Sequence, residues 1–346
     1  MKYTEYEKHL RVYLRELLGV DSPSGFTEKA ADRLEALIAG MGYESRRTRR
    51  GNVMVRVPGP EGAGTVGLAS HIDTLGLIVR SVSAKGEVMF SRIGGPVLPS
   101  LDGEYCRVYT RDGRVHTGTG LSLSPAKHVF PDASTRIRDE DNMYVRLDCE
   151  VRSREDVLAL GILPGDFICY DPKFEITETG FVKSRFLDDK ASAACLLTVL
   201  RLMKEQGARP ARSAEFIFTV YEEVGSGGAT VPEDLDELLI VDMGCVGLDL
   251  NCTETQVSIC PKDSAGPYDY AMTGRLIELA KKHGVDYALD VYPMYSSDAA
   301  VAWRAGHDVP AALIGPGVQA SHGMERTHLK ALLDTGKLIG AYLGLE

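Results

Sequence analysis

The pattern of apolar and polar positions divides the chain into two kinds of sequence. Leucines recur at helical spacing over residues 3–19, and a second helical pattern runs from about Thr27 to Gly40 and Gly42. The runs "NVMVRV" and "TVGLAS" that follow are short and apolar, which is typical of buried strands. The first segment of the chain therefore predicts helices alternating with strands.

Between residues 75 and 176 the pattern changes to short β-rich runs. "EYCRVYTRDGRVHTGTG" is one of them, and turn signals such as Lys-Gly and Asp-Gly separate the runs. A brief helical pattern near residues 153–160 is the exception. We therefore expect a small inserted β-barrel domain over residues 75–176.

After the inserted segment the alternation of helices and strands returns. A helical pattern covers roughly residues 190–205, and apolar strands are expected at 214–221 and at "ELLIVD". Continuous apolar strands alternating with helices predict a mostly parallel sheet that is covered on both faces. The predicted fold class is a mostly parallel three-layer α/β/α domain, formed by residues 1–74 and 177–346 and interrupted by the barrel.

Composition and charge restrict the class of protein. The 346 residues are 44% hydrophobic and 25% charged, as in an ordinary globular protein. The formal net charge of −10 argues against nucleic acid or an anionic membrane as the partner, and no apolar run is long enough to span a membrane. The charged N-terminus lacks the apolar core of a signal peptide, and the seven cysteines never form a CxxC spacing. We therefore expect a cytoplasmic protein with free thiols.

Candidate metal ligands follow the ends of several predicted strands. "TVGLASHID" leads to His71, "FIFTVYEE" to Glu222 and Glu223, and "LLIVDMG" to Asp242. Because ligands gather at the carboxyl ends of strands in open α/β sheets, we expect these side chains at one edge of the sheet. Further candidates are found in "SRFLDDKASA" and "QASHGMERTH": Asp188, Asp189, His322 and His328.

The residue types indicate which metals would bind. Imidazole and carboxylate ligands without thiolates suit zinc, cobalt or manganese, and the number of carboxylates favours two ions over one. Asp73 lies on the same face of an extended segment as His71, so we expect its carboxylate to accept a hydrogen bond from the ring. Of the two adjacent glutamates, one would bind metal while the other acts as a general base.

In combination these motifs resemble the tetrahedral (TET) metallo-aminopeptidases, which include glutamyl and deblocking aminopeptidases and have relatives labelled cellulases or endoglucanases. The resemblance covers nearly the whole chain. It rests on "SGFTE", "HIDTLGLIV", "SRFLDDKASA", "YEEVGSGGA", "VDMG", "SSDA" and a late histidine, in that order. It implies a catalytic domain of the phosphorylase/hydrolase-like type that removes N-terminal residues from peptides with a free N-terminus. It also implies a homo-oligomer, either a dodecamer or a smaller form based on dimers, with contacts from the inserted domain.

The resemblance further implies a role for each matching residue. Asp188 would bridge two divalent ions, which zinc fits best and cobalt or manganese also suit, and Asp73 would orient His71. Glu222 would be the general base, and Asp298 would contact the substrate. The metal ligands that it implies are His71, Asp188, Glu223, Asp242 and His322.

The chain departs from the usual pattern of that family at several positions. Thr74 follows the H-x-D motif where Glu is usual, Lys190 follows the acidic pair where Arg is usual, and Ser296–Ala299 usually reads Gly-Thr-Asp-Ala. The last histidine is commonly followed by Ser-Pro or Thr-Pro, whereas this chain reads "SHGMERTH". We prefer His322 to His328 as the ligand, because His328 leads directly into a helical pattern.

Three other functions stay open from the sequence. A glycosidase needs two carboxyl groups roughly 5–9.5 Å apart around the scissile bond, which adjacent Glu222 and Glu223 fit poorly, and Trp303 is the single tryptophan available to stack on sugars. A hydrolase of another amide, such as an acylated amino acid or a dipeptide, would keep the metals. A non-catalytic scaffold of the same fold would have no use for Glu222.

Overall fold

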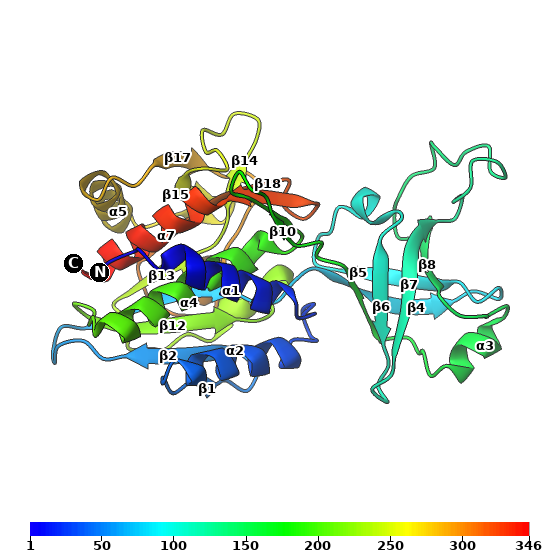
Figure 1. The fold of residues 1–346 in the computed structure, drawn as a ribbon, viewed down its shortest axis with the longest axis horizontal. Coiled ribbons are helices and arrows are strands. Elements are labelled where there is room, and N and C mark those ends of the chain that lie inside the picture. Colours follow the sequence, from blue (N-terminus) through cyan, green and yellow to red (C-terminus); the bar gives the residue numbers. More distant parts are fainter. Residues whose placement is uncertain (346) are drawn as a thin grey trace. The chain divides into compact units, whose positions relative to one another are not determined.

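The computed structural model describes residues 1–345 and divides the chain into an α/β unit and an inserted unit (Figure 1). The α/β unit comprises Met1–Asp73 and the chain from Lys173 onward, and the inserted unit comprises Thr74–Pro172. The predicted fold class, an α/β domain interrupted by a small β-barrel, is confirmed, but its sheet is mixed, with parallel strands at the centre and antiparallel strands beside them. Among the described residues no helix is long and apolar enough to cross a membrane.

The central strands of the α/β unit are parallel and lie in the order β12-β3-β13-β18. They are β3 (Thr65–His71), β12 (Ser213–Thr219), β13 (Glu237–Val241) and β18 (Ala311–Gln319). Every residue of β3 is buried, as expected of a strand that is covered on both faces. β2 (Val53–Val57) pairs antiparallel with β12. Shorter or peripheral strands extend this sheet: β1 (Arg46–Arg47), β10 (Glu175–Ile176), β11 (Phe181–Ser184), β14 (Gly244–Val246), β15 (Val257–Asp263), β16 (Gly266–Pro267), β17 (Tyr287–Val291) and β19 (Glu325–His328).

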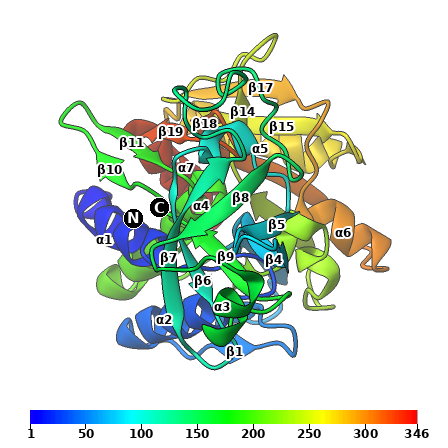
Figure 2. The same ribbon diagram turned by 90° about the vertical axis from the view of Figure 1, so that its right-hand side faces the viewer.

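Helices cover both faces of this sheet. α1 (Tyr6–Leu18), α4 (Leu187–Gln206) and α7 (Leu329–Tyr342) contact one another on one face, and Figure 2 shows α6 (Asp298–Arg304) on the other. Ala299 and Ala302 of α6 belong to one hydrophobic cluster with Leu238 and Ile240 of β13. The other helices of this unit are α2 (Glu28–Gly40), α5 (Tyr270–Lys282) and the short 3-10 turns η2 (Glu222–Val224) and η3 (Gly227–Ala229).

The inserted unit is a closed antiparallel barrel with the strand order β4-β5-β8-β7-β6-β9. Closure leaves no open sheet edge. The brief helix expected near residues 153–160 is α3 (Arg154–Ala159), and it begins at a capping box formed by Ser153 and Asp156. The barrel strands and the remaining 3-10 turn are β4 (Gly76–Val82), β5 (Val88–Ile93), β6 (Tyr105–Tyr109), β7 (Val115–Ser122), β8 (Met143–Leu147), β9 (Phe167–Tyr170) and η1 (Leu98–Leu101).

Candidate active site

The candidate ligands of the α/β unit meet where the central strands end. His71 is the last residue of β3 and Asp242 directly follows β13, its parallel neighbour, so both side chains lie at the same edge of the sheet. His71, Asp189 and Asp242 offer ligand atoms that all lie within 4.8 Å of one another, and so do His71, Asp188 and Glu223. One imidazole thus takes part in two adjacent groups of carboxylates, which is an arrangement that can hold paired ions.

Asp188 lies between two imidazoles. It occupies the irregular start of α4, where its backbone angles (φ −76°, ψ 102°) are not helical. One carboxylate oxygen is 3.1 Å from Nε2 of His71, and the other is 3.5 Å from Nε2 of His322. Burial alone would raise the pKa of Asp188, but hydrogen bonding to His322 and His71 lowers this pKa below its usual range. A carboxylate with an imidazole on each oxygen is placed as a bridging ligand would be.

Asp73 contacts His71 through its main chain and the two glutamates through its side chain. Nδ1 of His71 lies 3.0 Å from the carbonyl oxygen of Asp73, whereas the nearest carboxylate oxygen is 3.5 Å away. The carbonyl oxygen is therefore the nearer partner of the ring, and the carboxylate that we expected to orient the ring also faces Nδ1. The carboxylate accepts hydrogen bonds from the hydroxyl of Ser24 (2.5 Å) and from the N–H groups of Glu222 (3.2 Å) and Glu223 (3.4 Å).

The two adjacent glutamates lie in a turn and not at the end of the strand. β12 ends at Thr219 and not at residue 221 as predicted, because Tyr221 adopts a left-handed φ of 72° and directs the chain into η2. We call residues 220–228 the glutamate turn. Side chains of successive residues on a strand point to opposite faces, so this change of backbone conformation allows both carboxylates to approach one site.

Within the glutamate turn each carboxylate faces a different imidazole. An oxygen of Glu222 lies 3.8 Å from Nε2 of His71, and an oxygen of Glu223 lies 3.6 Å from Nε2 of His322. The second oxygen of Glu223 is buried and has no hydrogen-bond partner among the described residues. An orphaned buried oxygen of this kind fits the role of a metal ligand.

The carboxylates of the site are crowded and are buried or partly buried. Burial raises the pKa of Glu222, Glu223 and Asp189 well above their usual range, and it raises the pKa of Asp242 to about 7. Neighbouring carboxylates raise these pKa values further, because like charges disfavour ionisation. One buried oxygen of Asp189 also lacks a hydrogen-bond partner among residues 1–345. Divalent cations would offset this repulsion, so the residues present fit a metal centre.

Asn52 supports the glutamate turn from the neighbouring strand. It is 3% exposed and precedes β2. Its side-chain oxygen accepts the N–H of Val220 (3.1 Å), and its amide nitrogen donates to the carbonyl oxygen of Gly227 (3.0 Å). Both ends of the turn are therefore bound to one side chain, which the sequence motifs did not indicate.

Asp298, the first residue of α6, supports the same turn from the face of the sheet that α6 covers. Its carboxylate accepts hydrogen bonds from the hydroxyl of Thr219 (2.5 Å) and from the N–H of Gly228 (2.6 Å), and the residue is 4% exposed. A Cβ atom added to Gly228 would lie 2.2 Å from the carbonyl oxygen of Asp298, so this close approach requires glycine. The role of Asp298 as a substrate contact stays a prediction.

His322 and His328 have different surroundings. His322 follows β18 with a left-handed φ of 64°, and its Nε2 faces Asp188. His328 is the N-cap of α7, where its Nδ1 accepts the N–H of Lys330 (3.0 Å) and its Nε2 lies 2.9 Å from the carbonyl oxygen of Thr179. Both ring nitrogens of His328 are thus occupied, which supports His322 as the ligand.

Glu325 joins two candidate ligands through their main chain. One of its oxygens accepts the N–H of Asp188 (3.0 Å) and the other accepts the N–H of His322 (2.9 Å), and the residue is 2% exposed. The sequence signal for it is weak, since a glutamate three residues after a histidine is common. Asn52 is the supporting residue that the sequence motifs missed, whereas Glu325 lies in the segment "SHGMERTH", where the sequence indicates that charged residues could support the ligands.

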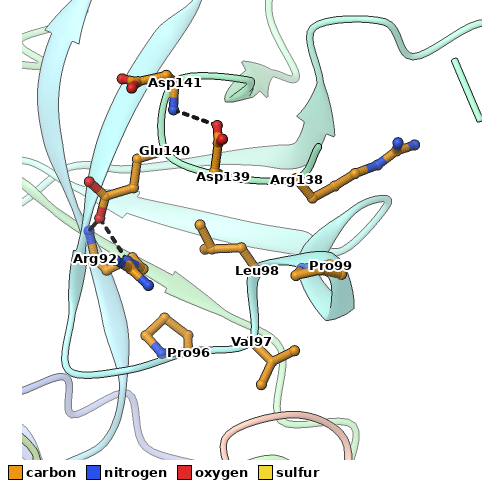
Figure 3. A pocket seen from close by; sticks show the side chains of 9 residues that line it. All are labelled: Arg92, Pro96, Val97, Leu98, Pro99, Arg138, Asp139, Glu140 and Asp141. Carbon is orange, nitrogen blue, oxygen red and sulfur yellow. Dashed lines mark hydrogen bonds and ion pairs between the residues drawn. The ribbon is translucent and has the colours of Figure 1, made fainter. Parts of the chain in front are cut away.

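A cavity of about 450 Å³ in the inserted unit offers no comparable set of groups (Figure 3). Its charged side chains bond to neighbours in the same unit: Arg92 pairs with Glu140 at 3.0 Å, and Arg138 pairs with Asp102 at 2.9 Å. Asp139 accepts the N–H of Asp141 at 3.1 Å. The candidate active site is therefore assigned to the α/β unit.

Comparison with known proteins relates the chain to aminopeptidases. Residues 51–338 match the family described as M42 glutamyl aminopeptidase. YhfE of Bacillus subtilis (strain 168), which carries an aminopeptidase name, is 41% identical over 331 residues that cover 95% of this chain and 96% of that protein.

Solved structures share the fold along nearly the whole chain. A TET aminopeptidase from the marine sediment archaeon Thaumarchaeota archaeon SCGC AB-539-E09 superposes with a TM-score of 0.87 at 22% identity, covering 96% of each chain. Pyrococcus horikoshii TET1 peptidase, which can assemble into a tetrahedron or a large octahedral shell, gives a TM-score of 0.84 at 21% identity over 96% of this chain and 99% of that one. The resemblance to TET metallo-aminopeptidases is thus confirmed. The chain belongs to the M42 glutamyl aminopeptidase family and is a metallo-aminopeptidase.

Proposed function

We propose that the chain is a dinuclear-metal aminopeptidase that removes single residues from the free N-terminus of peptides, with Glu222 as the general base. The observation that carries this proposal is the position of Asp188 between His71 and His322, with a second carboxylate, Glu222 or Glu223, near each imidazole. A glycosidase has no need of such a cluster of imidazoles and adjacent carboxylates.

The proposed ligands divide into two overlapping groups around Asp188. Two divalent ions, zinc by preference and cobalt or manganese as alternatives, would supply Lewis-acid polarisation of the scissile carbonyl and activation of water. Asp188 would contribute one oxygen to each ion. The full proposed ligand set is His71, Asp188, Glu223, Asp242 and His322.

The position of Glu222 beside the proposed ligands supports its assignment as the base. The N–H of Glu222 is bonded to Asp73, so the main chain of this residue is fixed while its side chain stays beside His71. A carboxylate held next to the ligands without serving as one accepts a proton during attack and returns it to the leaving amine. The adjacent Glu223 faces His322, which separates the base from the ligand within one turn.

Assembly and location are part of the same proposal. A solved structure of PhTET1-12s, at 20% identity and a TM-score of 0.82, is a dodecamer. We propose a homo-oligomer for this chain, a dodecamer or a smaller form based on dimers, with contacts from the inserted unit and a cytoplasmic location.

The test measures hydrolysis of aminoacyl-nitroanilides and short peptides by metal-stripped protein to which zinc, cobalt or manganese is returned. We expect metal-dependent release of single N-terminal residues. Glu222→Gln should lower kcat by about 100-fold or more while keeping two ions per chain, because only the base is removed. His322→Ala, the contrasting variant, should lose metal as well as activity.

Two outcomes would contradict the proposal. Full activity of Glu222→Gln would remove the assignment of the base. If protein that binds two ions released no residue with any metal, the function would move to hydrolysis of another amide or to a scaffold. Acylated amino acids and dipeptides assayed in parallel separate these last two functions.

A further inference from the structure

A cavity of about 390 Å³ adjoins the glutamate turn within the α/β unit. We call it the arginine pocket. It is lined by the start of α2 and the segment before it (residues 25–29 and 31), by residues 47–51 from the end of β1 into the turn before β2, and by Tyr221. The proposed catalytic steps use none of these residues.

Two walls of the arginine pocket are continuous with catalytic groups. Tyr221 directly precedes Glu222, and residue 25 directly follows Ser24, whose hydroxyl donates to Asp73. Consecutive Cα atoms are only about 3.8 Å apart. The pocket wall is therefore adjacent along the chain to the proposed base and to Asp73, a placement that would bring the pocket within reach of a peptide whose N-terminus is at the candidate metal centre.

The charge of the arginine pocket is opposite to that of the chain. The formal net charge of the chain is −10, yet Lys29, Arg47, Arg49 and Arg50 line the pocket. Glu28 is the acidic side chain among the lining residues. A concave basic site on an acidic protein attracts anions.

The arginines of the pocket differ in how far they are already neutralised. Arg47 is paired with Asp32 at 2.7 Å and also with Glu35. Arg49 and Arg50 are exposed, and within residues 1–345 neither forms an ion pair with a carboxylate. These two guanidinium groups are available to an external anion.

Two contacts hold the guanidinium of Arg50 beside the glutamate turn. Its guanidinium lies 4.3 Å from the centroid of the Tyr221 ring, and Nη2 donates to the hydroxyl of Ser226 at 3.1 Å. A guanidinium has five N–H donors, so these contacts leave further donors for a ligand. An anion bound at Arg50 is thus positioned relative to Glu222.

The first turn of α2 adds main-chain donors to the same cavity. Its N-cap residue Thr27 is 8% exposed and lines the pocket, but its side chain makes no capping hydrogen bond. The N–H groups at a helix N-terminus carry partial positive charge and bind anions when no side chain caps them.

We propose that the arginine pocket binds a carboxylate of the peptide substrate, namely the C-terminal carboxylate of short peptides whose N-terminus is at the candidate metal centre. Arginine binds carboxylates through two parallel hydrogen bonds, so the pocket recognises this group in preference to an amide. The inference rests on the proposed aminopeptidase function and adds to it a preference for short peptides with a free C-terminus.

The experiment compares peptides of two to five residues that have neutral side chains and either a free or an amidated C-terminus. We expect kcat/KM to favour the free acid by about tenfold at the matching length, mainly through KM, as one charged hydrogen-bonded contact provides. In the variant Arg49→Gln/Arg50→Gln this ratio should fall towards one. Arg209→Gln, which removes an exposed arginine outside the pocket, should keep the wild-type ratio.

Binding measurements separate this inference from the proposed function. Metal-loaded Glu222→Gln protein allows the Kd of the same peptides to be measured by calorimetry in the absence of turnover. Equal Kd values for acid and amide, or a ratio unchanged by the double variant, would overturn the inference while aminoacyl-nitroanilide hydrolysis still supports the aminopeptidase. Amidated peptides with an internal Glu or Asp are measured beside this panel. Arginine-dependent binding confined to these peptides would also overturn the inference, because the carboxylate would then come from a side chain.

Discussion

Several side chains in the active site act on the main chain of the ligands. The carboxylate of Asp73 accepts the N–H groups of the glutamate turn, and Glu325 accepts the N–H groups of Asp188 and His322. Such bonds fix the backbone position of the residues that carry the ligands and the base, so the loss of one supporting carboxylate displaces two of these residues together. Glu325 is the better residue for a test, because it touches neither the base nor His71 in the described contacts.

Glu325→Gln should lower metal affinity by about 10- to 100-fold. A carboxamide has one oxygen and one NH₂ group, so the N–H of either Asp188 or His322 loses its acceptor and faces a donor. His322 has a left-handed φ of 64° and needs this support to keep its ring towards Asp188. Competition with a chromophoric chelator measures the affinity, and elemental analysis gives the number of ions per chain.

Glu215→Gln is the matched control for this change. Glu215 is also fully buried in the α/β unit, but its carboxylate pairs with Arg46 (2.7 Å) and Arg56 (2.6 Å) at a distance along β12 from the glutamate turn. We expect it to lose stability and to keep metal affinity. If both variants released metal equally, general destabilisation would explain the effect and the positioning role of Glu325 would be wrong.

The local sequence pattern predicted most helices and strands, and with them part of the active site. An apolar run ends where β3 reaches His71 and where β13 gives way to Asp242, so these ligands could be found from the sequence. The glutamate turn could not be predicted from the sequence. It depends on the left-handed conformation of Tyr221 and on hydrogen bonds from Asn52 and Asp298, which are far away in the chain. Contacts of this kind leave no periodic signal.

Glu237, at the start of β13, joins the sheet to two helices. Its carboxylate accepts hydrogen bonds from Arg212 (2.9 Å) and from the hydroxyl of Tyr342 at the end of α7 (2.9 Å), and it also pairs with Arg275 of α5. Burial would raise the pKa of Glu237, but Arg212 and Tyr342 lower this pKa below its usual range. The ionised form is therefore the one that the fold stabilises.

Glu237→Gln should reduce the free energy of unfolding by about 1 kcal/mol at pH 7. The folded pKa is lower than the unfolded pKa of about 4.3, so the contribution is present above the unfolded pKa and is lost as pH falls through the folded pKa. The difference between variant and wild type should accordingly shrink at pH 3. Urea unfolding at both pH values measures it, and an equal difference at each would show that the charge of Glu237 is not what stabilises these contacts.

Metal binding should stabilise the folded state of the α/β unit and leave the stability of the inserted barrel unchanged. The proposed ligands all belong to the α/β unit, where Asp189 and Asp242 are buried, Glu222 and Glu223 are partly buried, and all four carboxylates have raised pKa values. Without cations these carboxylates repel one another or take up protons. The inserted barrel is closed by its own strands and contributes none of the proposed ligands.

Removal of metal by a chelator should therefore destabilise the α/β unit selectively. Ions that bind only the folded state stabilise it by about 2.7 kcal/mol when their free concentration is 100 times Kd. Hydrogen exchange followed by mass spectrometry should show faster exchange in peptides from β3 and from the glutamate turn after stripping, with protection restored by zinc. Peptides from the barrel strands should exchange at the same rate in both forms. Equal acceleration of exchange in the two units would mean that metal acts on assembly or on global unfolding. The loss of local contacts at the metal site would not change the exchange rate of strands that carry none of its ligands.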